Sequence, residues 1–292
     1  MDVDQLKAFL LVVNTKSFTR AAESMNVVQS TITTRIQMLE RELGKELFKR
    51  DKRQISLTSA GRSFLPYAER IVELSREGMK VVQLEHSFHD QLVVGTTHAI
   101  WDYVIFEAID RFHTTYPDIS VRMITEHSSI IIRKMIDGLI DWGIVFYPVH
   151  HSKLELIPII EDTFELIAAP TFTTPPIPLI PDDLRTLPYV HLNWGGSFSD
   201  WIQQIFGSHY VFPLEVDHVS LLLKFLQSKQ GVGFLPRSVA KSLIHNGVVI
   251  SLPFITDTPI PKRMIYLVQR KGNISIEHTE KLTEYIKIAF SQ

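Results

Sequence analysis

Residues 17–44, which read SFTRAAESMNVVQSTITTRIQMLERELG, contain two helical patterns separated by a turn of three residues. Ser17 is placed to cap the first helix, Phe18–Met25, in which two adjacent alanines allow another helix to approach closely. The second helix is expected over Ser30–Leu43 and ends at Gly44, a favoured residue after a helix. Its inward face has the helical period and consists of Ile32, Ile36, Leu39 and Leu43. The spacing therefore predicts a helix-turn-helix over about residues 18–37.

The flanking residues extend this motif to a winged helix-turn-helix over residues 1–58. A preceding helix, capped by Asp2 or Asp4, is predicted from the apolar spacing of Leu6, Phe9, Leu10 and Val13. Two short strand candidates, Leu47–Phe48 and Ile55–Leu57, flank the basic segment Lys49–Gln54 and predict a hairpin, or wing. The alternative interpretation is a small helical bundle for protein contacts.

The charge of the chain is unevenly divided. The 292 residues carry 30 Lys and Arg against 32 Asp and Glu, a formal net charge of −2. Residues 1–62 hold eleven basic and seven acidic side chains, a net charge of +4, which leaves −6 for the rest. A basic head on an acidic body is typical of a protein whose head binds nucleic acid, and an ordinary solvated surface that carries four net charges is the alternative.

Composition also limits the cellular compartment of the protein and the kinds of chemical site that it can form. The absence of cysteine excludes disulfides, thiolate metal sites and cysteine nucleophiles. The acidic N-terminus does not resemble a signal peptide, and no apolar run is long enough to span a membrane. We therefore expect a cytoplasmic protein that does not associate with membranes.

Polar side chains on the second helix of the motif are the candidates for reading DNA. Gln can bond adenine through two hydrogen bonds, Thr methyl groups can contact thymine, and Arg can bond guanine or phosphate. Basic residues on the wing can reach the minor groove or the backbone. The predicted contacts with double-stranded operator DNA are Gln29, Ser30, Thr31, Thr33, Thr34, Arg35 and Gln37 on the helix, and Arg50, Lys52 and Arg53 on the wing.

Residues 1–66 closely resemble the N-terminal domain of LysR-type transcriptional regulators, a bacterial family. The matching stretches are Asp4–Phe9, Ser17–Ala22, Leu39–Gly44, Leu47–Phe48 and Leu57–Gly61. Two positions depart from the family pattern, because Val28 stands where Ser is common and Ser30 stands where Pro is common. We therefore expect the cap of the second helix to shift to Ser30 and the DNA-reading face to be individual to this protein.

A long helix is predicted after the wing, capped by Thr58 and covering residues 59–88. Gly78 inside it marks a potential bend. Two apolar stripes suit a helix that contacts its own head and a partner chain: Phe64, Ala68, Ile71 and Leu74, and Leu65, Val72, Met79 and Val82. The resemblance implies a dimer through this linker helix, a tetramer built as a dimer of dimers, and contact with RNA polymerase. A plain intramolecular strut is the alternative.

From residue 91 onward strand and helix patterns alternate, which predicts an α/β body with mostly parallel sheets. Strands are expected at 92–95, 119–125, 142–146, 189–192, 214–217 and 263–269, and helices at 100–116, 129–137, 199–206, 220–228 and 275–290. The proline-rich stretch Pro170–Pro181 is interpreted as a crossover between lobes.

This body also resembles the effector-binding domain of the same family, through Asp137–Ile144 and Gln230–Arg237. The resemblance implies two Rossmann-like lobes, like those of type 2 periplasmic binding proteins, with a small-molecule cleft between them. The expected effector-binding domain covers 91–292, with lobe I at about 91–162 and 266–292 and lobe II at about 163–265.

Ligands of open α/β sheets lie beyond the carboxyl ends of strands, where helix N-termini favour anions. This rule gives the effector-binding candidates Thr96, Thr97, His98, Ser128, Ser129, Phe146, Asn193, Trp194, His218 and Val219. Taken one at a time, each Ser or Thr is better explained as an ordinary helix cap. Together they predict a small-molecule effector, with an organic acid as the default class and His98 and His218 as partners for its charge.

No cofactor, metal site or catalytic residue is predicted. The histidines lack the spacing of metal ligands on a helix, and no hydrolase, Walker or metalloprotease motif is present. Gly231 and Gly233 lack the third glycine of a dinucleotide-binding loop. The predicted function is an effector-controlled transcriptional regulator of the LysR type rather than an enzyme. Two alternatives remain open, an effector-independent architectural DNA binder and an α/β enzyme with a DNA-binding head.

Overall fold

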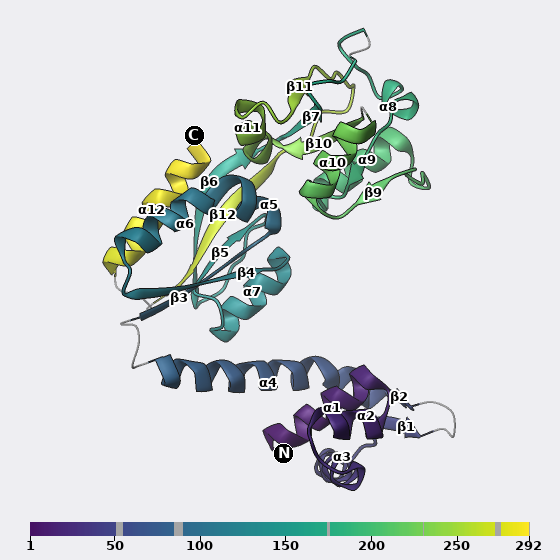
Figure 1. The fold of residues 1–292 in the computed structure, drawn as a ribbon, viewed down its shortest axis with the longest axis vertical. Coiled ribbons are helices and arrows are strands. Elements are labelled where there is room, and N and C mark those ends of the chain that lie inside the picture. The colour runs from purple at the N-terminus through teal and green to yellow at the C-terminus, as the bar shows by residue number, and fades with distance from the viewer. Residues whose placement is uncertain (51–54, 85–89, 174–175, 230, 272–275, 292) are drawn as a thin grey trace. The chain divides into compact units, whose positions relative to one another are not determined.

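The computed structural model describes residues 1–50, 55–84, 90–173, 176–229, 231–271 and 276–291 (Figure 1). The chain forms two compact units, Met1–Ser87 and Phe88–Gln292. The first contains three helices, a hairpin and a long helix, and the second is a mixed α/β body.

The first unit begins with the predicted helix-turn-helix and wing. Its elements are α1 (Val3–Thr15), α2 (Phe18–Ser24), α3 (Gln29–Leu43), β1 (Phe48–Arg50) and β2 (Ile55–Leu57), with β1 and β2 antiparallel. The side chain of Asp2 accepts a hydrogen bond from the N–H of Gln5, and Ser17 caps α2 in the same way. Capping side chains satisfy backbone donors that have no partner inside the helix, and they fix where α1 and α2 start.

Helix α3 departs from the sequence prediction at its start. It begins at Gln29, and its N-cap is Val28, which makes no side-chain capping bond. The expected cap at Ser30 is therefore wrong, because Ser30 lies inside the first turn. The helix ends as predicted, with Gly44 as its C-cap in the left-handed conformation, but Leu43 in the last turn is 38% exposed rather than inward.

The core of this unit joins the head to the long helix α4 (Ser59–Leu84). The hydroxyl of Thr58 accepts a hydrogen bond from the N–H of Gly61, so Thr58 caps α4 as predicted. Phe9, Ile36 and Leu47 are buried together with Ala68 of α4. Gly61 is required at this contact, since a Cβ there would overlap the carbonyl of Leu47.

The second unit contains a five-stranded sheet, around which we define lobe I. Its order is β4–β3–β5–β12–β6, from the strands β3 (Asp90–Thr96), β4 (Ile119–Thr125), β5 (Trp142–Val145), β6 (Leu154–Asp162) and β12 (Arg263–Arg270). Strand β3 is parallel to β4 and β5, whereas β12 is antiparallel to β5 and β6. The expectation of mostly parallel sheets is wrong here. Strand β12 comes back from lobe II and pairs antiparallel with both of its neighbours, β5 and β6.

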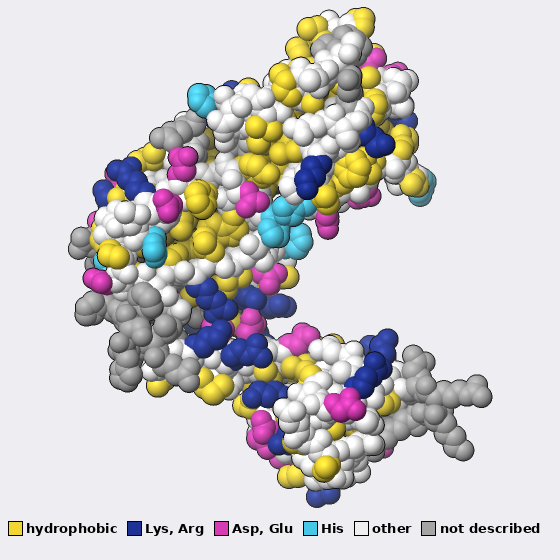
Figure 2. Space-filling model, in the orientation of Figure 1, with side chains coloured by type: hydrophobic (Ala, Val, Ile, Leu, Met, Phe, Trp, Pro, Cys, Tyr) yellow, Lys and Arg dark blue, Asp and Glu magenta, His cyan; other side chains and the backbone are white. Residues whose placement is uncertain are grey.

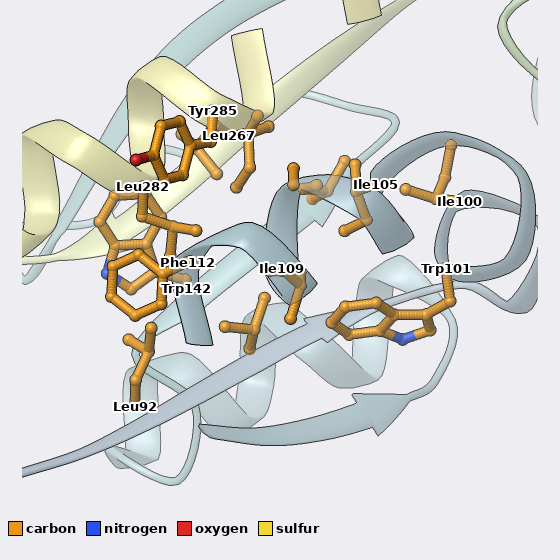
Figure 3. Close-up of a cluster of buried hydrophobic side chains, with 14 of the residues drawn as sticks. Leu92, Ile100, Trp101, Ile105, Ile109, Phe112, Trp142, Leu267, Leu282 and Tyr285 are labelled. Atoms are coloured by element: carbon orange, nitrogen blue, oxygen red, sulfur yellow. The ribbon is translucent and has the colours of Figure 1, made fainter. Parts of the chain in front are cut away.

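Two layers of helices complete lobe I. They are α5 (His98–Ile100), a π-helical turn η1 (Trp101–Ile105), α6 (Phe106–Thr115), α7 (Ser128–Asp137) and the closing helix α12 (Ile276–Ser291). Figure 3 shows Phe112 of α6 and Leu282 of α12 packed near Trp142 of the sheet. The single helix predicted over 100–116 is therefore interrupted by a π-turn, a feature that often occurs at functional sites.

Lobe II is built around the antiparallel sheet β10–β7–β11 and the parallel pair β8–β9. Its elements are β7 (Phe164–Ala168), α8 (Asp183–Thr186), β8 (His191–Leu192), α9 (Gly196–Phe206), β9 (Glu215–Val216), α10 (Val219–Lys229), β10 (Val232–Pro236), α11 (Arg237–His245) and β11 (Ile250–Leu252). The three-stranded sheet is a second place where mostly parallel pairing was wrongly expected.

The chain crosses between the lobes at residues 162–164 and again just before Arg263. Asp162 and Arg263 are register partners where β6 and β12 meet the crossovers. The predicted return at about residue 266 therefore falls inside β12. Pro170–Pro181 is not a crossover, because it follows β7 within lobe II and places Leu179, which is fully buried, in the core of that lobe.

Candidate DNA-binding and effector-binding sites

The outward face of α3 presents short polar side chains. Gln29, Ser30, Thr34 and Gln37 are exposed, and Thr31 and Thr33 are half-buried. The hydroxyl of Thr33 donates to the carbonyl of Gln29 at 3.1 Å, and the hydroxyl of Thr19 donates to the side-chain oxygen of Gln29 at 3.2 Å. Exposed amide and hydroxyl groups on one helix face can bond base edges and phosphates.

The side chain of Arg35 forms an ion pair with Asp4 of the first helix, α1. Its Nη2 lies 3.0 Å from Oδ2 of Asp4, and its Nη1 lies 3.7 Å from the sulfur of Met25. The Arg35 side chain is 25% exposed and that of Asp4 is 54% exposed. A DNA phosphate would therefore compete with Asp4 for this guanidinium.

The wing is described only in part. Arg50 pairs with Ile55 at the end of the hairpin. Lys52 and Arg53 lie outside the described residues.

In lobe I, only some of the predicted effector residues are accessible. Thr96 is fully buried, and its hydroxyl donates to the carbonyl of Ile144 at 3.1 Å. Ser128 is buried and accepts a hydrogen bond from the N–H of Phe146 at 3.3 Å. The remaining predicted residues, Thr97, His98 and Ser129, are half-buried or exposed. Thr96 therefore supports the sheet, and we leave it out of the site that we propose.

In lobe II, the predicted residues are mostly engaged within the fold. Oδ1 of Asn193 accepts hydrogen bonds from the N–H of Gly195 at 2.8 Å and the hydroxyl of Ser199 at 2.5 Å. Nε1 of Trp194 donates to the carbonyl of Phe234 at 2.9 Å. The side chain of Val219 is buried, so only its backbone can face a ligand.

Two of the predicted residues meet across the lobes. His98, just after β3, and His218, just before α10, have ring centroids 4.7 Å apart. Nδ1 of His218 lies 2.9 Å from the hydroxyl of Ser220. Figure 2 shows one group of His side chains on the second unit, with further His side chains scattered apart from it. The contact brings together residues of both lobes that are 120 positions apart in the chain.

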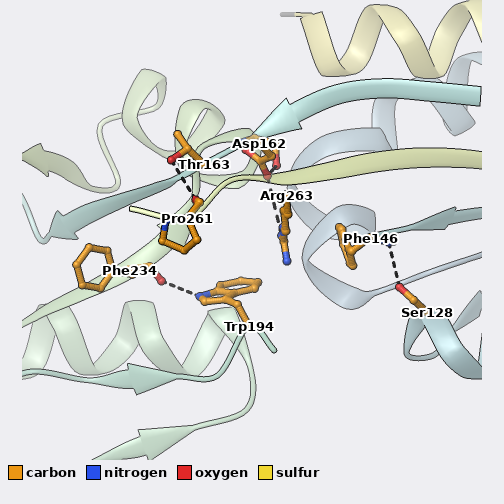
Figure 4. A network of polar contacts seen from close by, with 9 residues as sticks. Ser128, Phe146, Asp162, Thr163, Trp194, Phe234, Pro261 and Arg263 are labelled. Carbon is orange, nitrogen blue, oxygen red and sulfur yellow. Dashed lines mark hydrogen bonds and ion pairs between the residues drawn. The ribbon is translucent and has the colours of Figure 1, made fainter. Parts of the chain in front are cut away.

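A second meeting point surrounds Arg263, which was not predicted as a site residue. Its guanidinium carbon lies 4.1 Å from the ring centroid of Phe146, 5.2 Å from Phe164 and 5.7 Å from Trp194 (Figure 4). Burial lowers the pKa of Arg263 to about 10, and the charge of Asp162 opposes this shift. The only signal in the sequence was a basic residue at the start of an otherwise apolar strand.

The lobes also share an apolar contact next to the π-turn. Ala99 is buried in a cluster with Val190 and Leu235 of lobe II, and Tyr103 packs against the same cluster. Burial, and secondarily the charge of Asp102, raises the pKa of Tyr103. Movement of one lobe would disturb this contact.

Among the residues that the structure describes, no three His, Cys, Asp or Glu side chains are grouped to hold a metal ion. No helix within those same residues is long and apolar enough to cross a bilayer.

Comparisons with known proteins cover both units. Residues 3–62 match the family described as bacterial regulatory helix-turn-helix protein, lysR family. Residues 85–291 match the family described as LysR substrate binding domain.

Relatives and solved structures agree with this result. The HTH-type transcriptional regulator HdfR of Yersinia pestis (strain Pestoides F) is 27% identical over 240 residues, 81% of each chain. The structure of CbnR, a LysR family transcriptional regulator, has a TM-score of 0.70 at 22% identity and covers both chains fully. CbnR complexed with its target DNA gives 0.68 at 23% identity, over 99% of this chain and 100% of that one. The winged helix-turn-helix, the two-lobed body and the two family matches together show that the chain belongs to the LysR family of bacterial transcriptional regulators, with a DNA-binding domain and an effector-binding domain, and is not an enzyme.

Proposed function

We propose that this regulator binds operator DNA with the outward face of α3 and responds to an organic anion that binds between lobes I and II. The observation that carries the effector site is the contact of His98 with His218, since a ligand there touches both lobes. Histidine side chains, hydroxyl groups and free backbone N–H groups suit an anion. The proposed contacts are Thr97, His98, Ser129, Phe146, Asn193, Trp194, His218 and the backbone of Val219; Ser128, which is buried like Thr96, is not among them.

For DNA we propose base contacts from Gln29, Ser30, Thr31, Thr33, Thr34 and Gln37. Arg35 would bind phosphate or guanine, and Arg50, Lys52 and Arg53 would contact the DNA from the wing. The exposed side chains of α3 support this assignment. Electrostatic contacts of this kind predict that log K falls linearly as log salt rises.

We also propose that α4 is the linker through which two chains pair in the cytoplasm. Several large apolar side chains on this helix remain exposed in the single chain: Tyr67, Leu74, Met79 and Val82. Pairing would bury them and would place two DNA-binding heads on a dyad-symmetric site. A tetramer and a contact with RNA polymerase extend this proposal.

Genomic fragments bound by the purified protein, followed by footprinting, test the DNA-binding part. A protected dyad-symmetric site whose affinity falls with salt is expected. Loss of protection in a Gln29→Ala/Thr34→Ala variant with an unchanged melting temperature would support the proposed face. Unchanged protection in that variant would refute it.

The anion part is tested by adding organic acids to the protein–operator complex. We expect at least one acid to change the affinity or the length of the footprint, and the change to be lost in His98→Ala and His218→Ala. If no acid has an effect, an effector-independent architectural role is favoured.

A further inference from the structure

The guanidinium of Arg263 sits at the start of β12, directly after the second crossover. Figure 4 shows it pointing into the space between Phe146 of lobe I and Trp194 of lobe II. The side chain is 11% exposed, so it is nearly enclosed while it keeps some contact with solvent. A positive charge in such surroundings normally has a carboxylate and several hydrogen-bond acceptors.

Arg263 has only part of that compensation. Among the described residues its ion pair is with Asp162, and the atoms Nη2 and Oδ2 are 3.9 Å apart, too far for a hydrogen bond. The carboxylate of Asp162 already accepts two hydrogen bonds from Ser238. Its Oδ1 accepts from the backbone N–H of Ser238 at 3.0 Å, and its Oδ2 accepts from the Ser238 hydroxyl at 2.8 Å. Nε of Arg263 is buried with no acceptor among the described residues.

The other arginine of the same strand provides a comparison. Arg270, at the far end of β12, lies 3.9 Å from a carboxylate oxygen of Asp141. It also donates from Nη1 to the carbonyl of Gly138 at 3.2 Å, whereas Arg263 has no such bond to the described residues. The two arginines therefore share an ion-pair distance, but only Arg263 has a buried Nε without an acceptor among the described residues.

The surroundings select the kind of anion. A guanidinium binds a carboxylate through two parallel hydrogen bonds. The rings of Phe146, Phe164 and Trp194 make the site apolar, which penalises strongly hydrated phosphate or sulfate and favours an apolar group attached to the acid.

We propose that Arg263 binds the carboxylate of the effector, and that the effector is a small carboxylic acid whose apolar part packs on Phe146 and Trp194. This inference rests on the proposed function, in which an anion binds between the lobes. Because the guanidinium contacts aromatic rings from both lobes, a carboxylate that draws it away changes an interlobe contact.

The test uses the full-length protein and measures its melting temperature and tryptophan fluorescence. The probes are mono- and dicarboxylic acids of two to ten carbons, including benzoate and cyclohexanecarboxylate, with benzyl alcohol and inorganic phosphate for comparison. At about 10 mM we expect at least one acid with an apolar body to raise the melting temperature by about 2 °C or more. Benzyl alcohol and phosphate should have no effect.

Variants separate Arg263 from a general charge effect. Arg263→Gln should weaken binding of that acid at least about 10-fold, and Arg263→Lys should also weaken it because the two-pronged geometry is lost. Arg270→Gln should bind the acid like the wild type. Trp194→Phe should remove most of the fluorescence change without abolishing binding.

Three results would overturn the inference: no acid binds, phosphate binds as well as the acids do, or Arg263→Gln keeps its affinity within about twofold. Operator binding without acid is measured on the same preparations. Operator binding that responds to another class of anion, with Arg263→Gln responding like the wild type, would leave the proposed function standing while this inference fails.

Discussion

Replacing Asp4 by Asn tests whether Arg35 is a DNA contact held in reserve by an intramolecular ion pair. The two charged groups are 3.0 Å apart and partly exposed, at 25% for Arg35 and 54% for Asp4. Partly exposed pairs contribute a net of about 0.2–1 kcal/mol, far less than their direct Coulomb attraction in a low dielectric. If Arg35 must leave Asp4 to reach DNA, Asp4→Asn removes a cost of about 0.5–1 kcal/mol, and the operator Kd should fall about two- to fivefold.

The assay is fluorescence anisotropy with a labelled operator fragment between about 50 and 200 mM salt. Because Arg35 reaches the DNA in both proteins, the slope of log K against log salt should be nearly the same for the wild type and Asp4→Asn. The control is the same substitution in an Arg35→Gln background, where the gain should disappear. An unchanged or weaker affinity in Asp4→Asn, or an equal gain in the Arg35→Gln background, would refute the reasoning.

Three further predictions concern stability. Thr58→Ala should lower the free energy of unfolding of the DNA-binding unit by about 1 kcal/mol, because the N–H of Gly61 loses its hydrogen-bond acceptor. Thermal melts of the wild type, Thr58→Ala and Thr58→Ser measure this, and Thr58→Ser should keep most of the wild-type stability. Phe112→Ala should cost lobe I about 3–5 kcal/mol in urea unfolding, since Phe112 is fully buried, and a cost under 1 kcal/mol would contradict the packing described. Burial lowers the pKa of His191 below 6.5, and the charge of Glu215 only partly offsets this, so below about pH 6.5 the unfolded chain binds a proton that the folded chain does not. Stability should therefore fall from pH 7 to pH 5.5 by less than about 1.4 kcal/mol per pH unit, and the slope should flatten in His191→Gln.

Local signals sufficed for the head of the protein. The period of Ile32, Ile36 and Leu39, the caps at Ser17 and Thr58 and the C-terminal Gly44 all act within a few residues, and each is where the sequence predicts it. The wrong cap at Ser30 has a local cause as well. The helix starts at Gln29 without any capping side chain, so a serine one residue later is taken into the first turn.

The body of the protein was harder to predict because its pairings are long-range. Strands β6 and β7 follow one another closely, yet β6 pairs with β12 and β7 pairs with β10 and β11. No local pattern shows that β12 would return antiparallel to β5, or that Leu179 would be buried inside lobe II. These features depend on which strand edges are free when the chain comes back.

The sequence by itself determined the class of the protein, and it predicted the polar face of α3, His98 and His218 as candidate site residues. These follow from helical period and from the rule that ligands lie beyond the ends of strands. Only the tertiary structure decided that Thr96 is buried, that Arg35 is paired with Asp4, and that Arg263 lies among aromatic rings from both lobes, with no acceptor for its Nε among the described residues. The physical reason is that burial and charge compensation belong to the surroundings of a side chain, and residues far away in the sequence supply those surroundings.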